Sequence, residues 1–203
     1  DIYCMAYPDY PIAGYDNWKD IVAKHEPVQG EPNREPKDLA TIIYTSGTTG
    51  MPKGVMLDFH SFSFAMSHAM KTVGLGNDSK YFSYLPLCHI AERFLVEMGG
   101  LYSGGQTAYA ESIDTFAQNL QEIQPTVFLG VPRIWTKFQQ GILAKLPQKK
   151  LNLLLSIPII SGLIKKKIKK GLGLTNATNT LTGAAPTPVA LMQWFSKLGI
   201  NIQ

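Results

Sequence analysis

Short runs of β-branched and aromatic residues alternate along most of the chain with longer stretches whose apolar positions recur at helical spacing. The runs predict strands over 41–44, 81–85, 106–110 and 126–129, and the longer stretches predict helices over 59–71, 90–102 and 115–123. A helix is the usual crossover between parallel strands, so this alternation favours a parallel sheet. The pattern therefore predicts an α/β fold, a mostly parallel sheet flanked by helices, with ligands at the carboxyl ends of the strands.

The first 40 residues do not follow this pattern. They are rich in Pro, Gly, Asp and Lys, and only 18–23 reads as a short helix, so 1–40 is predicted to be a connector before a domain at 41–203. The chain begins with Asp rather than Met and has no basic-then-apolar leader, which favours an interior start in a longer protein. No stretch approaches the ~20 apolar residues of a bilayer-spanning helix.

Cysteine usage and charge limit the class of protein further. Cys4 and Cys88 form no CxxC, which argues against a zinc or disulfide scaffold and favours the cytoplasm. Residues 1–122 hold 8 Lys and Arg against 15 Asp and Glu, whereas 123–203 hold 11 against none. The basic part could face nucleic acid, a membrane or acidic segments of the same protein. Its aromatic and basic residues are not interleaved as in single-strand binders, so nucleic acid is not expected as a partner.

The run from Ile42 to Gly54, Ile-Ile-Tyr-Thr-Ser-Gly-Thr-Thr-Gly-Met-Pro-Lys-Gly, places small residues between a strand and a lysine. Glycines let main-chain N–H groups approach an anion, hydroxyls add donors, and Lys53 adds a positive charge. Pro52 and Gly54 stand where a Walker P-loop needs Gly and Ser or Thr, which disfavours that class of NTPase. The alternative is a Gly/Thr turn without a ligand, but this much constrained chemistry after a strand favours a phosphate-binding loop.

This loop resembles the signature of the adenylate-forming, or AMP-binding, superfamily, which includes acyl-CoA synthetases, luciferases and peptide-synthetase adenylation domains. The resemblance implies that the loop holds the β- and γ-phosphates of ATP while a carboxylate attacks the α-phosphate. Mg²⁺ is implied as well, with Thr45 as a metal ligand. The phosphate-binding residues implied are Thr45, Ser46, Gly47, Thr48, Thr49, Gly50 and Lys53.

A second segment, Tyr-Leu-Pro-Leu-Cys-His-Ile-Ala-Glu-Arg over 84–93, follows a predicted strand and opens a helix. A lone histidine there is more often structural than catalytic, and Glu92 and Arg93 could equally be charges at a helix start. The segment resembles the second motif of acyl-CoA synthetases, in the His-Ile-x-Glu-Arg form of the long-chain fatty acid branch. That resemblance implies a catalytic role for His89 and places His89 and Ile90 at the acyl site.

Two further segments follow predicted strands. Val-Pro-Arg-Ile-Trp at 131–135 predicts a helix that starts at Pro132, and it resembles the Val-Pro-Arg segment of long-chain acyl-CoA synthetases, although Arg133 could instead be a scaffold ion-pair partner. Thr-Leu-Thr-Gly-Ala-Ala-Pro at 180–186 predicts a strand that ends in a turn of small residues, with room for a flat ring. It resembles the family's Ser-Gly-Ala-Ala-Pro element, which implies an adenine pocket lined by Gly183, Ala184, Ala185 and Pro186.

An apolar stretch at 151–164 precedes the lysine-rich run 165–170. An apolar patch beside lysines suits peripheral contact with a membrane through 151–170, at the inner face for a cytoplasmic protein. The alternative is a buried helix with a solvated end, interrupted at Pro158.

Taken with the resemblance, these segments imply a fragment of the N-terminal domain of a long-chain fatty acid-CoA ligase. Such an enzyme converts ATP and a fatty acid into acyl-AMP and then transfers the acyl group to coenzyme A; the resemblance also allows a homodimer. The family continues beyond the equivalent of Gln203 into a Tyr-Gly-x-Thr-Glu motif and a C-terminal domain, so this chain alone is expected to be inactive. The alternatives are a fatty acyl-AMP ligase or peptide-synthetase-type adenylation domain, and a non-catalytic nucleotide-binding module.

Overall fold

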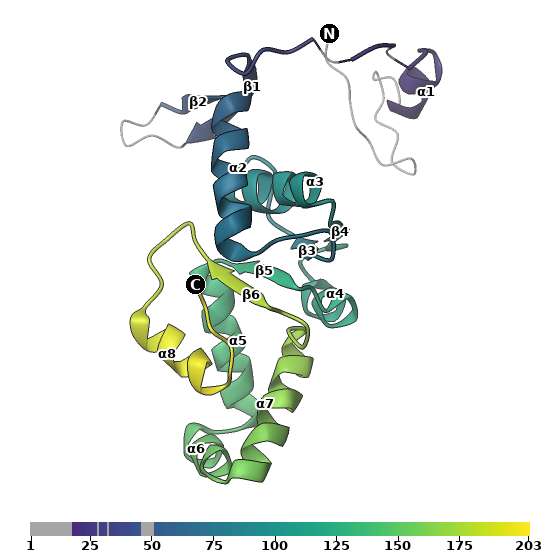
Figure 1. Ribbon diagram of the computed structural model, residues 1–203. Coiled ribbons are helices and arrows are strands. Elements are labelled where there is room, and N and C mark those ends of the chain that lie inside the picture. The colour runs from purple at the N-terminus through teal and green to yellow at the C-terminus, as the bar shows by residue number, and fades with distance from the viewer. Residues whose placement is uncertain (1–17, 28, 32, 46–50) are drawn as a thin grey trace. The chain divides into compact units, whose positions relative to one another are not determined.

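The computed structural model describes residues 18–27, 29–31, 33–45 and 51–203, which belong to two compact units, 1–35 and 36–203. In the first unit the described secondary structure is helix α1, Trp18–Ala23. The second unit contains the strands and helices that carry the predicted site (Figure 1). The predicted short helix at 18–23 is therefore present.

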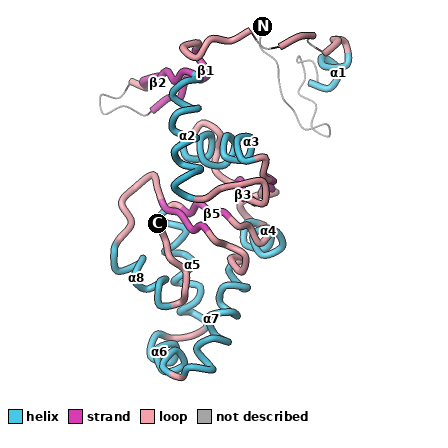
Figure 2. Tube along the Cα trace, viewed as in Figure 1, coloured by secondary structure: helices cyan, strands magenta, loops and turns pink. Residues whose placement is uncertain are grey.

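A four-stranded sheet in the order β4–β3–β5–β6 forms the centre of the second unit, and all its strands are parallel. Figure 2 shows strands in magenta, with β3 and β5 among the helices in cyan. The strands are β3 Lys80–Ser83, β4 Gln106–Tyr109, β5 Val127–Gly130 and β6 Asn179–Thr182. Beyond β6, Ile202 pairs in parallel with Thr180 through an isolated bridge. The predicted α/β fold with a parallel sheet is confirmed.

Helices connect successive strands of this sheet, as crossovers between parallel neighbours must. The π-helical segment η1 runs into α3 between β3 and β4, α4 lies between β4 and β5, three helices lie between β5 and β6, and α8 follows β6. Their bounds are η1 Glu92–Met98, α3 Gly99–Ser103, α4 Phe116–Ile123, α5 Pro132–Lys145, α6 Gln148–Ser156, α7 Pro158–Leu172 and α8 Val189–Lys197. The predicted helix start at Pro132 and the interruption at Pro158 both hold, because proline fits the first helical turn but not a helix interior.

The predicted strand at 41–44 is not part of the parallel sheet. It lies in β1, Leu39–Thr45, which pairs antiparallel with β2, Lys53–Asp58, as a separate two-stranded sheet. Helix α2, Phe59–Val73, follows β2 directly, and the Asp58 side chain accepts the Ser61 N–H at 2.7 Å as its N-cap. Because β1 pairs with β2 instead of joining the parallel sheet, the alternation of parallel strand and helix begins only at β3.

Two clusters of apolar side chains cover the two faces of the parallel sheet. Successive residues of a strand point to opposite faces, so neighbours along one strand belong to different clusters. Phe82 and Phe128 belong to the larger core cluster, together with Trp135 of α5 and Phe195 of α8. Their strand neighbours Tyr81 and Val127 belong to a second cluster, which includes Val96 of η1 and Leu75 after α2. Burial of each such side chain contributes about 1.5–3 kcal/mol relative to exposure. Apolar side chains thus pack against both faces of the sheet.

Candidate active site

Three of the predicted segments leave the parallel sheet at the same edge. Segments 84–91, 131–133 and 183–188 follow the carboxyl ends of β3, β5 and β6, which are neighbours in the sheet. The Tyr84 hydroxyl donates to the backbone oxygen of Leu129 at 3.0 Å and so joins the first segment to β5. The carboxyl edge of a parallel sheet is where ligands commonly bind, so these three segments meet at one candidate site.

Glu92 fixes the turn between β3 and η1. Its side chain is 1% exposed, and Oε2 accepts the Leu85 N–H at 3.2 Å. Burial raises the pKa of this carboxyl, against the opposing effect of hydrogen bonds from the Ser83 side chain and the backbone of the turn. Oε1 has no hydrogen-bond partner within the described part of the chain. Glu92 thus lies in the first turn of η1, where a charge at a helix start is expected, and its carboxyl is buried against the backbone of the preceding turn.

His89 lies at the point where this turn becomes a helix. Its backbone N–H donates to the Pro86 oxygen at 2.9 Å, and its Nδ1 accepts the Ala91 N–H at 3.2 Å. A neutral imidazole that accepts at Nδ1 carries its proton on Nε2, so Nε2 is the nitrogen able to donate to a ligand. The ring is half-buried, and the neighbouring Ile90 is exposed. His89 and Ile90 thus lie at the carboxyl edge of the parallel sheet, and their role at an acyl site stays a prediction.

Arg93 connects the second motif to the hairpin. Its Nη1 forms an ion pair with the Glu97 carboxylate at 3.0 Å, and its Nη2 donates to the Thr41 hydroxyl in β1 at 3.5 Å. The second bond is long and therefore weak. Through it, the hairpin that carries the predicted phosphate loop contacts the segment that carries His89.

The two ends of the predicted phosphate loop face each other across the hairpin. Thr45 pairs with Lys53 in the β1–β2 register, and the Thr45 hydroxyl donates to the Lys53 backbone oxygen at 3.4 Å. Both residues are exposed, so the Lys53 ammonium is accessible to an anion. The remaining predicted residues of this loop, Ser46, Gly47, Thr48, Thr49 and Gly50, lie outside the described residues.

A hydroxyl such as that of Thr45 is the kind of hard oxygen ligand that Mg²⁺ accepts. Within the described ranges, no group of three or more His, Cys, Asp and Glu could hold a metal ion. The Thr45 hydroxyl therefore fits Mg²⁺ as one of several oxygen ligands, beside phosphate oxygens and water.

The small-residue turn after β6 has a strained backbone. Ala184 has a φ of 70°, in the left-handed region that costs a residue with a Cβ roughly 1–2 kcal/mol. The hydroxyls of Thr182 and Thr187 lie 2.7 Å apart and close the turn. Ala184, Ala185 and Pro186 are exposed, and Gly183 is half-buried. Such strain is concentrated at functional sites, and the exposed small residues leave space for a planar group.

Arg133 is exposed at the start of α5 and makes no ion pair with any residue that the structure describes. The scaffold ion-pair role considered for it from the sequence stays a hypothesis. Just before it in the chain, Gly130 approaches the buried Trp135 so closely that an added Cβ would lie 2.7 Å from the indole nitrogen.

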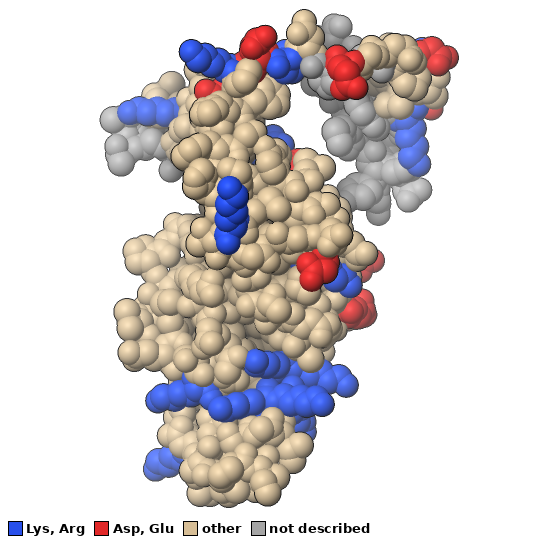
Figure 3. All heavy atoms as spheres, viewed as in Figure 1, with Lys and Arg blue, Asp and Glu red and all other residues tan. Residues whose placement is uncertain are grey.

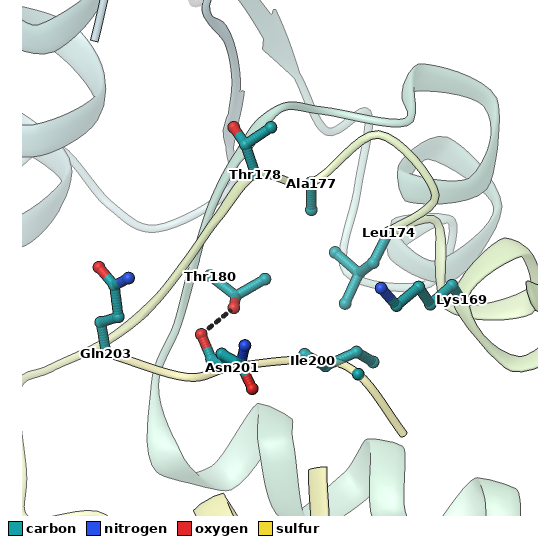
Figure 4. A pocket seen from close by; sticks show the side chains of 9 residues that line it. Lys169, Leu174, Ala177, Thr178, Thr180, Ile200, Asn201 and Gln203 are labelled. Atoms are coloured by element: carbon teal, nitrogen blue, oxygen red, sulfur yellow. Dashed lines mark hydrogen bonds between the residues drawn. The ribbon is translucent and has the colours of Figure 1, made fainter. Parts of the chain in front are cut away.

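A small pocket of about 130 Å³ lies elsewhere, around the start of β6 (Figure 4). Lys169, Thr178 and Asn201 line it, and the Thr180 hydroxyl donates to the Asn201 backbone oxygen at 2.6 Å. None of the predicted site residues borders this pocket. The candidate site is therefore the carboxyl edge of the sheet and not this cavity.

Comparison with known proteins gives a consistent result. The model of the AMP-binding enzyme family matches residues 9–203. The chain is 33% identical to the long-chain-fatty-acid–CoA ligase ACSBG2 of Xenopus laevis, over 84% of this chain and 27% of that protein. It is 30% identical to long chain acyl-CoA synthetase 5 of Arabidopsis thaliana, over 84% of this chain and 29% of that protein. The adenylation domain of the carboxylate reductase from Mycobacterium chelonae superposes with a TM-score of 0.72 at 26% identity, over 93% of this chain and 30% of that one. The chain thus spans less than a third of each.

Proposed function

The chain belongs to the AMP-binding enzyme family, and from this membership we propose that the whole protein is a long-chain fatty acid-CoA ligase. It would activate a fatty acid with ATP as acyl-AMP and then transfer the acyl group to coenzyme A. The observation that carries the proposal is the convergence of three predicted segments at the carboxyl edge of β3, β5 and β6. Relatives with about 30% identity that are named long-chain ligases support the substrate class.

Each residue in the proposal has a role that its position allows. Lys53 and the loop before it bind the β- and γ-phosphates, since an exposed ammonium beside main-chain N–H groups suits an anion. Nε2 of His89 donates a hydrogen bond to an oxygen of the acid or of the adenylate, with Ile90 beside the acyl chain. Gly183, Ala184, Ala185 and Pro186 lie against the adenine ring. Mg²⁺, when bound, would neutralise phosphate charge, and the Thr45 hydroxyl would hold it.

A second candidate function is acyl activation with transfer to a carrier protein instead of coenzyme A. It is favoured by the structural similarity to an adenylation domain of a carboxylate reductase. The two functions share the adenylation step and differ only in the acceptor of the acyl group.

Residues 41–203 would then be part of the family's N-terminal domain in a cytoplasmic enzyme, which we propose to be a homodimer. Light scattering on the whole protein would test the dimer. Within the described residues, no helix is long and apolar enough to cross a membrane.

The decisive experiment measures pyrophosphate release by the whole protein with acids of increasing chain length, with and without coenzyme A. Turnover that needs coenzyme A and favours long chains supports the ligase; turnover that needs a carrier protein instead supports the second candidate. His89→Ala should lower kcat by about 10²-fold or more, as expected for loss of a positioned donor. The matched control is His68→Ala, on the exposed side of α2, which should leave kcat within about twofold. ATP binding without pyrophosphate release for any acid would refute the proposal and indicate a non-catalytic module.

A further inference from the structure

Helices α6 and α7 expose aliphatic side chains where they join. Leu153 is 64% exposed, Ile157 40%, Ile159 82% and Leu163 65%. We call these four residues the α6–α7 tip. Single exposed aliphatic residues are ordinary, but four within eleven positions of two packed helices form a patch of the kind that marks an interaction site.

Lysines surround the base of the tip. Lys149 and Lys150 lie in the first turn of α6, and five lysines occupy 165–170 in the second half of α7. We call these seven residues the lysine belt. Residues 132–172 contain ten Lys and Arg and no Asp or Glu, so the helical segment carries one sign of charge. Figure 3 shows Lys and Arg in a band across the molecule, with mostly uncharged surface beyond it at the end where Figure 1 places α6.

The tip is held in place by the rest of the fold. Leu151 of α6 is buried in the larger core cluster, and Leu155 and Ile164 pack against that cluster. The Trp194 indole N–H in α8 donates to the Gln148 side chain at 2.8 Å. The exposed aliphatic residues therefore project from an anchored helix pair.

We propose that the α6–α7 tip and the lysine belt together dock on a lipid bilayer with anionic headgroups. Along α7, Ile159 and Lys166 are seven residues apart, or about 10 Å at the helical rise of roughly 1.5 Å per residue. Interfacial helices bury apolar side chains about 5–10 Å into the boundary of headgroups and acyl chains. The tip would then reach the acyl region while the lysines remain level with the headgroups.

The uniform positive charge favours this occupant over a second copy of the chain. Two copies that met through the tip would bring two lysine belts together, and like charges repel. An anionic bilayer is complementary to both parts of the surface at once. Each lysine near such a bilayer strengthens binding about fivefold.

Flotation of the whole protein with vesicles tests the proposal. One set of vesicles is phosphatidylcholine alone, and in the other about a third of the lipid is phosphatidylserine. The triple variant Lys166→Gln, Lys167→Gln, Lys170→Gln should lower the affinity for anionic vesicles about hundredfold. The control Lys24→Gln, Lys37→Gln, Lys71→Gln removes the same charge from exposed positions elsewhere and should change it less than about threefold.

A second pair of variants tests the aliphatic contact. Ile159→Ser with Leu163→Ser should weaken binding to both kinds of vesicle by about tenfold or more, whereas Leu101→Ser with Ile113→Ser, also strongly exposed, should not. Unfolding midpoints within about 2 °C of wild type establish that the variants are folded.

Any of three outcomes would overturn the proposal. The first is that the wild type does not bind vesicles, and the second is that the lysine variant and its control bind them equally well. The third is that the tip variants change the oligomeric state in light scattering but leave the binding to vesicles unchanged. Pyrophosphate release with a short, water-soluble acid should be unchanged in every variant. A failure of membrane docking is thus distinct from a failure of the proposed ligase activity.

Discussion

Gly130→Ala should destabilise the protein through a single added methyl group at the end of β5. An ideal Cβ at this position would lie 2.7 Å from Nε1 and 2.8 Å from Cε2 of Trp135, and 3.0 Å from a ring carbon of Phe128. Distances this short require a neighbour to move. Trp135 is fully buried, and its ring contacts those of Phe128, Phe138 and Phe195. A shift of the Trp135 ring would therefore displace another aromatic ring.

Overpacking of a filled core costs about 1–3 kcal/mol, and the rigid neighbours here place Gly130→Ala near 2 kcal/mol. The control is Gly141→Ala in α5, where an added Cβ would meet nothing within 4 Å. Alanine is a better helix former than glycine by about 0.8–1.0 kcal/mol, so this variant should be more stable than wild type. The same substitution, Gly to Ala, is therefore expected to lower the free energy of unfolding at position 130 and to raise it at position 141, eleven residues further along the chain.

Urea denaturation followed by circular dichroism would measure both effects. With an m-value of about 2 kcal/mol/M, Gly130→Ala should lower the midpoint by about 1 M and Gly141→Ala should raise it by about 0.5 M. If Gly130→Ala were as stable as wild type, the close packing of β5 on α5 would be wrong. The position of segment 131–133 at the candidate site would then lose its physical basis.

Three further substitutions concern the candidate site directly. Burial raises the pKa of Glu92 above its ordinary value, so the native state binds the proton more tightly than the unfolded state does. The free energy of unfolding therefore falls as pH rises between the pKa of the unfolded state and that of the native state. Glu92→Gln should flatten that fall in urea titrations from about pH 4 to about pH 7, and equal slopes would contradict it. Tyr84→Phe removes the hydroxyl that donates to Leu129 and should cost about 1 kcal/mol. Because burial raises the pKa of Tyr84 to about 12, the wild type should lose stability from pH 10 upward, where the unfolded state ionises first, and the variant should not show this loss. Ala184→Gly should relieve the left-handed strain and raise thermal stability by about 0.5–1 kcal/mol; a loss would show that the strain is absent.

Local signals in the sequence predicted much of the second unit. Strands 81–85 and 126–129, the helix start at Pro132 and the break at Pro158 depend on residue type and on periodicity over a few positions, and all four are present. Helix α8 was not among the predicted elements. The family was also readable from the run 45–53, because short runs of Gly, Thr and Lys have a restricted chemistry that does not depend on distant contacts. The phosphate-binding role of that run stays a prediction.

Pairings between distant segments were decided by the tertiary structure. The strand at 41–44 pairs with its own return strand rather than with the parallel sheet, since the choice between partners depends on which surface each strand can bury. The sequence allowed Glu92 to be a charge at a helix start, and it lies in the first turn of η1. Its burial and the hydrogen bond that it accepts from the Leu85 N–H depend on the packing of η1 on β3. Residue patterns alone placed segments 84–91, 131–133 and 183–188 after strands. The strand order β3–β5–β6 brings them to one edge, and that order could not be read from the patterns because adjacency in a sheet is a property of non-local hydrogen bonds.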